Sequence, residues 1–232
     1  MQETEKRPEK KESALLNIAL NVALPALIMT KLSAPEYLGE TWSLMVALSL
    51  PLGYGIYDYI QRRKINFFSI LGLFSVLMTG GIGLFKLSRN WMIAKETIVP
   101  LIMGLAVIAT QNTRFSLVRL FFDQMIDLEK IKESFAEKAQ GNHFDKLLGI
   151  ACMGLGLSFL VSAGLNFYLA STILIGEPGT VEFTESLGRM TALSFPVIVL
   201  PMMVMVGAIL FYFFRTIHKI TQRPFEEFLR QP

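Results

Sequence analysis

The stretch Thr79–Pro100, TGGIGLFKLSRNWMIAKETIVP, decides the fold. It ends one apolar run with glycines, crosses a short basic segment containing Lys86 and Arg89, and begins the next apolar run at Trp91. Two long apolar runs joined by so few polar residues are typical of neighbouring helices in a membrane protein. The same alternation continues on both sides of this stretch, which predicts an all-α, polytopic membrane helical bundle.

The composition supports a membrane protein with a single compact domain. Of the 232 residues, 52% are hydrophobic and only 18% are charged, which is less charge than a soluble domain usually carries. The apolar runs reach about 20 residues, enough to cross a hydrocarbon core of about 30 Å. The lone Cys152 lies inside one of these runs, so an intramolecular disulfide is excluded.

Six transmembrane helices and one amphipathic helix are expected. The spans cover about residues 14–30, 42–60, 65–85, 91–110, 147–174 and 190–214. Residues 114–137 place apolar side chains at helical spacing, which predicts one amphipathic helix on the membrane surface or docked under the bundle. Gly141, Asn142 and His143 are expected to end it, and the acidic segment 176–188 to form a loop. The membrane domain then covers 13–220, between a disordered tail at 1–12 and a second tail at 221–232.

The basic residues predict the orientation in the membrane. In the six-span topology, 17 of the 22 Lys and Arg residues fall on the side of the N-terminus and five on the other side. Positively charged segments stay in the cytoplasm, so both termini are predicted to be cytoplasmic, in a bacterial inner membrane. The lipid bilayer accounts for this pattern, and nucleic acid is not expected as a partner. Arg62, Arg63 and Lys64 are expected to fix the topology and to contact anionic lipid head groups.

Lys95 and Glu96 are predicted to lie about one turn inside the membrane. A charge at that depth suggests a functional site, here for a polar or ionic solute. The structural alternative is that Lys95 extends its ammonium to the boundary while Glu96 pairs with Lys86, Arg89 or Arg189. Adjacent side chains point about 100° apart on a helix, so the two residues are expected to need different partners.

Asparagines supply the second set of polar groups within the spans. Asn17 and Asn21 share one face of the first span, and Asn166 lies on the fifth. Either these amides bond to each other between helices, or they line a polar cavity. The first run is interpreted as an uncleaved span because it is long and lacks a clear cleavage site. The complete candidate polar or ionic site is Lys95, Glu96, Thr97, Asn17, Asn21, Asn166 and Arg189.

Small residues predict close helix packing on the third and fifth spans. Such stripes let backbones approach closely, either within the bundle or between copies in a homo-oligomer. Three prolines, Pro51, Pro100 and Pro201, fall near mid-depth and act as packing kinks or as a hinge plane. The candidate packing residues are Gly72, Gly80, Gly81, Gly83, Gly154, Ser158 and Ser162.

Enzymatic motifs are missing from the sequence. It contains no His/Cys cluster, no phosphate-binding glycine loop and no nucleophile elbow. No catalytic residue, metal site or cofactor is therefore expected, and the protein is predicted not to be an enzyme.

Scattered positions resemble a known family. They are Gly80–Gly81 followed by Leu84–Phe85, then Trp91, Lys95 and Thr97, then LVR at 117–119 and LNFYLA at 165–170. This pattern resembles the bacterial intracellular septation protein A family, and most of all its uncharacterised distant relatives. The resemblance implies a non-enzymatic inner-membrane protein that supports cell-envelope synthesis and septation through partner proteins. The alternative function is a small secondary transporter using the candidate polar site.

Overall fold

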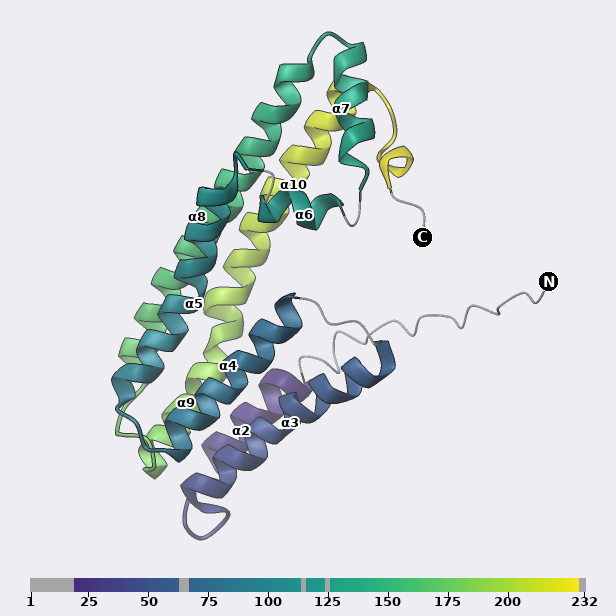
Figure 1. Cartoon of the computed structure of the whole chain (residues 1–232). Helices are drawn as coiled ribbons and strands as arrows, with labels where there is room; N and C mark the ends of the chain where they lie inside the picture. The colour runs from purple at the N-terminus through teal and green to yellow at the C-terminus, as the bar shows by residue number, and fades with distance from the viewer. Residues whose placement is uncertain (1–18, 63–66, 114–115, 124–125, 230–232) are drawn as a thin grey trace, which may run out of the picture. The chain divides into compact units, whose positions relative to one another are not determined.

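The computed structural model describes residues 19–62, 67–113, 116–123 and 126–229, and these are almost entirely helical (Figure 1). Within this part of the chain there is no extended strand, and one isolated antiparallel bridge joins Ile126 to Leu229. The all-helical class predicted from the sequence is confirmed. The chain divides into two compact units, one made of Met1–Met92 with Ile173–Leu193, the other of Ile93–Thr172 with Ser194–Pro232.

Three of the described helices are long and apolar enough to cross a membrane. They are α5 (Arg89–Thr110), α8 (Gly141–Ile173) and the continuous helical run Val181–Thr221. Two further apolar helices are shorter within the part of the chain that the structure describes, Ala19–Lys31 and the Phe74–Leu84 part of α4. The chain therefore has the helices of a membrane protein, and the count of six spans stays a prediction.

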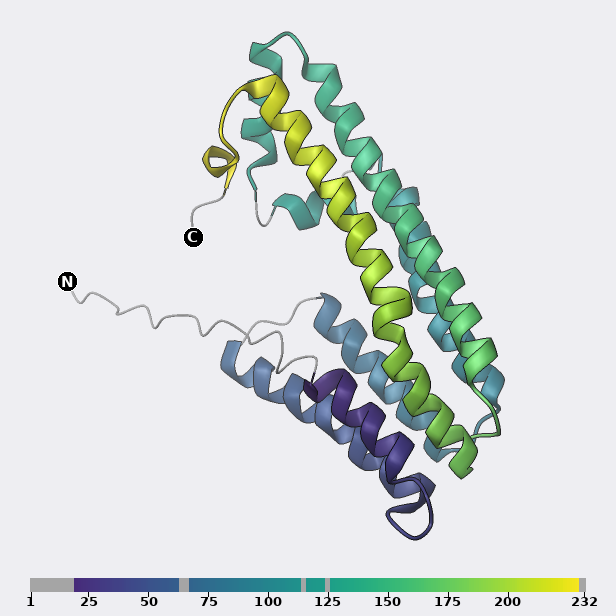
Figure 2. The ribbon, with the colours of Figure 1, turned by 180° about the vertical axis from the view of Figure 1, so that it is seen from behind.

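The first unit is built on α3. It contains the π-helical turn η1 (Ala19–Ala23), α2 (Leu24–Lys31), α3 (Gly39–Arg62), α4 (Phe67–Leu84) and most of α9 (Val181–Ser194). Both α2 and α4 contact α3, as the two views in Figures 1 and 2 show. Asn17, Arg63 and Lys64 lie outside the described residues, and Arg62 is the last residue of α3.

The second unit places two short helices against the ends of long ones. It contains most of α5, then α6 (Leu117–Asp123), α7 (Leu128–Glu137), α8, the π-helical turn η2 (Phe195–Val199), α10 (Leu200–Thr221) and the 3₁₀ turn η3 (Phe225–Phe228). We call α6, α7, η3 and the adjoining ends of α5, α8 and α10 the head. Its core is formed by Val107, Val118, Phe122, Ile126, Leu128, Ile131, Phe135, Phe144, Leu147, Leu148, Ala151, Cys152, Phe213, Ile217 and Phe228.

The single amphipathic helix expected over residues 114–137 is wrong, because α6 and α7 are separate helices. Asp127 breaks the run: its carboxylate accepts the backbone N–H of Lys130 at 3.0 Å and so caps α7. Apolar side chains of both helices, among them Phe122 and Ile131, are buried in the head. Of the two predicted placements, docking against the protein therefore describes this segment. The segment beginning at Gly141 also differs from expectation, since it starts α8.

The last helical run is longer than expected. Part of the predicted loop 176–188 is helical from Val181, because Thr180 caps α9 by accepting the N–H of Phe183 at 3.2 Å. The run continues to Thr221 through a π-helical turn that directly precedes Leu200 and Pro201. Proline lacks the N–H that a helix needs at this point, and π-turns commonly accommodate such a break. The predicted tail from residue 221 is also partly ordered, through η3.

Candidate functional site

The charged pair on α5 is internal to the helix. Lys95 Nζ lies 2.7 Å from Glu96 Oε1, so the two adjacent residues pair with each other. The prediction that they need different partners is wrong, because both side chains are long enough to bend around the helix and meet. Lys95 is only 7% exposed, so the protein encloses most of its side chain. A buried ammonium requires such a partner, and the pair carries no net charge.

The other candidate polar residues bond within their own helices. Thr97 Oγ1 donates to Ile93 O at 2.8 Å. Asn166 Nδ2 donates to Ser162 O at 2.8 Å and lies 3.3 Å from Ser162 Oγ. Each of these polar groups is therefore satisfied locally, without the bond between helices that was one expectation for Asn166.

The two remaining candidates belong to the first unit. Arg189 lies 3.7 Å from Glu185, one turn earlier on α9, and its side chain is 65% exposed. Asn21 is part of the π-helical turn η1 and also has a bonding partner. These two residues therefore belong to a different unit from the other described candidates.

The small-residue stripes are occupied by neighbouring helices. In the first unit, a methyl group at Gly80 would lie 3.2 Å from Leu48 of α3, and one at Gly83 would collide with Leu44. In the second unit, a methyl group at Gly154 would lie 3.1 Å from Ile209 of α10, and Ser158 and Ser162 are buried. Gly81 meets only Phe85 at 4.0 Å, and the surroundings of Gly72 lie outside the description. The stripe on α4 thus packs within the first unit and the stripe on α8 within the second, which leaves both less suited to a contact between copies.

A tight contact that the sequence pattern did not predict joins α5 and α8. A methyl group at Gly104 would lie 2.9 Å from the backbone oxygen of Gly156, and one at Gly156 would collide with Ile108. The two helices therefore cross backbone to backbone at this point. The missed signal is the pair of glycines itself, one near the middle of each apolar run.

Residues 85–89 and 174–180 form a second feature, which we call the loop junction. Glu177 Oε2 accepts the N–H of Arg89 at 2.9 Å, and Arg89 Nη1 donates to Leu174 O at 3.0 Å. The carboxylate thus caps the positive end of α5. Lys86 lies two residues after the end of α4 and has a φ of +51°. Its alkyl chain packs against Gly179, which has a φ of +91°. Arg89, one of the predicted partners of Glu96, thus bonds to this loop.

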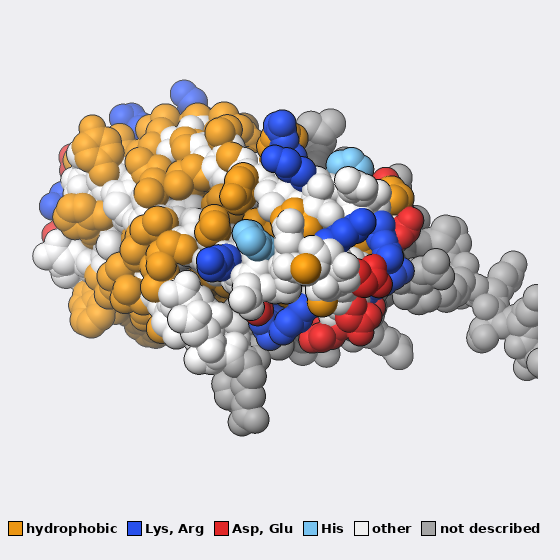
Figure 3. All heavy atoms as spheres, turned by 90° about the horizontal axis from the view of Figure 1, so that it is seen from above, with side chains coloured by type: hydrophobic (Ala, Val, Ile, Leu, Met, Phe, Trp, Pro, Cys, Tyr) orange, Lys and Arg blue, Asp and Glu red, His pale blue; other side chains and the backbone are white. Residues whose placement is uncertain are grey.

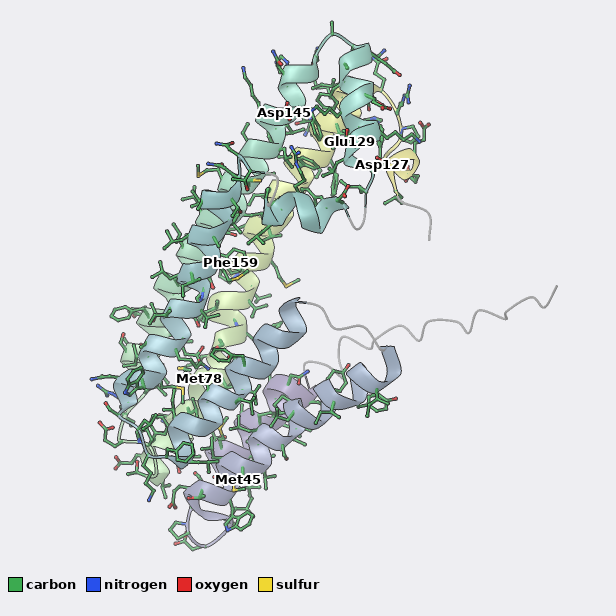
Figure 4. All side chains as sticks on the ribbon, in the orientation of Figure 1. Met45, Met78, Asp127, Glu129, Asp145 and Phe159 are labelled. Atoms are coloured by element: carbon green, nitrogen blue, oxygen red, sulfur yellow. The ribbon has the colours of Figure 1, made fainter. Side chains whose placement is uncertain are left out.

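The head carries charges of both signs around a small cavity. The cavity has a volume of about 130 Å³ and is lined by Arg119, Asp123, Leu128, Glu129, Lys132 and Phe144. Asp145 on α8 lies 3.9 Å from both Arg119 and Lys132 (Figure 4). Figure 3, which looks down on this end, shows acidic and basic side chains side by side on the surface. Cationic and anionic groups thus balance each other here and do not form a one-sign site.

Among the described residues, no group of three or more His, Cys, Asp or Glu side chains is placed to hold a metal ion.

Comparisons with family models, with curated proteins and with solved structures find no match to this chain. The pattern shared with the septation protein A family therefore stays a prediction from the sequence.

Proposed function

We propose that the chain is a non-enzymatic, six-span protein of a bacterial inner membrane with both termini in the cytoplasm. Support comes from the three long apolar helices and from the side chains that they leave uncovered. On α5 these include Ile98 and Ile102, and on α10 they include Met203 and Val204, which is 72% exposed. Lipid is the solvent that suits such surfaces, since large uncovered apolar patches are rare on soluble monomers.

We further propose that the protein acts by binding other proteins of envelope synthesis or septation. The observation that carries this proposal is the head, a folded body with its own aromatic core at one end of the second unit. In the proposed topology the head lies in the cytoplasm, because the segment containing α6 and α7 holds many of the basic residues. Its exposed side chains, among them Lys132 and Glu133, carry both charge signs, which suits the polar rim of a protein-binding surface better than the one-sign basic patch of a nucleic-acid site.

A site-specific photo-crosslinker tests this proposal in native membranes. Introduced at Glu133 on the head, it is expected to capture a defined envelope or division protein. The matched control places the same crosslinker at Val204, where lipid is the expected neighbour. Equal capture profiles at the two positions would contradict binding through the head.

A second candidate function, transport of a polar or ionic solute, is favoured by the burial of Lys95, which is paired with the half-buried Glu96. An ion pair inside a protein usually stabilises it no more than well-packed apolar residues of similar volume would. The presence of this pair therefore favours a functional role over a purely structural one. The double variant Lys95→Met with Glu96→Gln removes both charges together, so neither residue is left as an unpaired charge. If the pair serves transport, solute uptake by membrane vesicles is lost at an unchanged protein level. Unchanged uptake would make the pair purely structural.

A further inference from the structure

The segment 222–229, which we call the strap, folds back from the end of α10 onto α7. The reversal occurs at Gln222, which adopts the left-handed conformation with φ of +56° and whose N–H bonds to His218 O at 2.9 Å. Pro224 comes two residues later and leads into η3. A residue with a side chain is strained in this conformation, so the contacts that the strap makes with α7 must hold the turn in place.

One aromatic side chain anchors the strap. Phe228 is fully buried and belongs to the head core together with Ile126 and Ile131. Glu226 and Glu227, directly before it, are exposed. The strap therefore covers an apolar groove with the ring of Phe228, and the groove cannot be left open to water without a large cost.

Few polar contacts support that ring. The N–H of Asp127 donates to Phe228 O at 2.8 Å, beside the bridge between Ile126 and Leu229. Lys130 Nζ donates to Glu227 O at 2.8 Å. The third contact is an exposed ion pair between Arg223 and Glu137 at 3.0 Å, a kind of pair that adds little stability.

We propose that the strap is exchanged between two copies of the chain, so that Phe228 of each copy fills the groove of the other. The groove and its fitting segment are both present in every chain, which is the requirement for domain swapping. Extending the chain at Gln222 relieves its strained turn and breaks the bonds at the turn, among them those of His218 to Gln222 N–H and to Arg223 O. The contacts of the strap with α7 are kept, now made across the pair. Strained hinge segments of this length favour such exchange.

The geometry of the membrane favours this exchange. Copies inserted in one bilayer share one orientation, so all heads face the same compartment. Eight extended residues reach at most about 26–29 Å, more than the 10–12 Å diameter of a helix with its side chains. The reach sets the largest separation over which exchange can occur, so the exchange requires two heads in contact with their grooves within that distance. The inference goes beyond the proposed function, since exchange between copies does not require an envelope partner.

Paired single cysteines in full-length chains test the exchange. One copy carries Ile126→Cys and the other, differently tagged, carries Leu229→Cys, both with Cys152→Ala. Antiparallel bridge partners lie at a distance suited to a disulfide, so mild oxidation of co-expressing membranes should join the two tags. The control pairs Leu229→Cys with Asp145→Cys. Asp145 is exposed on α8, whereas the strap pairs with the residue that precedes α7 (Figure 4). We expect at least tenfold more joined product from the bridge pair than from the control.

The hinge supplies a second readout. Gln222→Gly relaxes the left-handed turn and should lower the exchanged fraction by about tenfold, whereas Gln222→Val should raise it. In a chain that carries both cysteines, the disulfide can form within that chain. If it does, while the singly substituted chains give no more interchain disulfide than the control pair, the proposal is overturned.

If the double-cysteine chain does not close, co-capture of two tagged wild-type copies decides. Absence of co-capture, or co-capture that persists when both copies carry Phe228→Ala, overturns the exchange. A negative result in the envelope-partner experiment leaves these outcomes unaffected, so the two proposals fail separately.

Discussion

The head and the loop junction solve the same problem, holding two chain segments together, by different physical means. The head buries aromatic rings: Phe122 stacks on Phe213 with centroids 4.9 Å apart, and Phe135 meets Phe144 edge to face at 5.7 Å. The loop junction relies on two hydrogen bonds of Arg89 and on glycine turns. Buried apolar area contributes more per residue than exposed hydrogen bonds do, so the head should be the more costly to disrupt.

The largest effect is expected from Phe135→Ala in the head. Removing a fully buried ring leaves a cavity and should cost about 3–5 kcal/mol of unfolding free energy. Thermal unfolding in detergent, followed by circular dichroism, measures the loss. The matched control is Phe85→Ala in the loop junction, whose side chain is 79% exposed and should cost less than about 0.5 kcal/mol. Similar losses for the two variants would remove the contrast between the regions.

An intermediate effect is expected from Gly179→Ala in the loop junction. At φ of +91° a side chain is strained, and the new methyl group would lie 2.7–2.9 Å from the alkyl chain of Lys86. Because Lys86 can move away, the cost reflects mainly the backbone and should be about 1–2 kcal/mol. Gly149→Ala in α8 has open space around it and should be neutral or stabilising by up to about 1 kcal/mol. If the two variants unfold at the same temperature, the turn does not depend on glycine.

The smallest effect is expected from Glu177→Ala. It removes the carboxylate that accepts the N–H of Arg89 and should cost about 1 kcal/mol, visible as faster amide hydrogen exchange in the first turn of α5. Glu177→Gln keeps an accepting oxygen and should exchange at an intermediate rate. Arg189→Ala, which breaks an exposed pair on α9, should leave exchange in α5 unchanged. Unchanged exchange in Glu177→Ala would mean that the cap contributes nothing to the junction.

Local sequence pattern predicts the long helices well, because their apolar runs are bounded by clear polar segments. The span expected at 91–110 corresponds to α5, Arg89–Thr110, and the span at 65–85 to α4, Phe67–Leu84. The break between α6 and α7 could have been predicted from Asp127, which stands where a helix-capping residue belongs. Its other cause, the pairing of Ile126 with Leu229, joins residues far apart in the sequence and leaves no local signal.

The candidate polar site was harder to predict than the helices. Helical geometry fixes the directions of the Cβ atoms of Lys95 and Glu96, but it does not fix the ends of two long side chains, which meet. For Asn166, a bond to the preceding turn of its own helix satisfied the amide before any neighbouring helix was needed. Composition indicates where polar groups lie along a span, whereas their partners depend on rotamers and on helix contacts.

The burial of Cys152 gives the protein an internal probe of its own opening. It is the only cysteine of the chain, is fully buried in the head core, and lies 3.6 Å from Ser116 Oγ. A thiol reagent reaches this sulfur only when the head opens, so the labelling rate of the unmodified protein reports how often α6 and α7 separate from α8. Motion of this one region can thus be timed in intact membranes without introducing any foreign group.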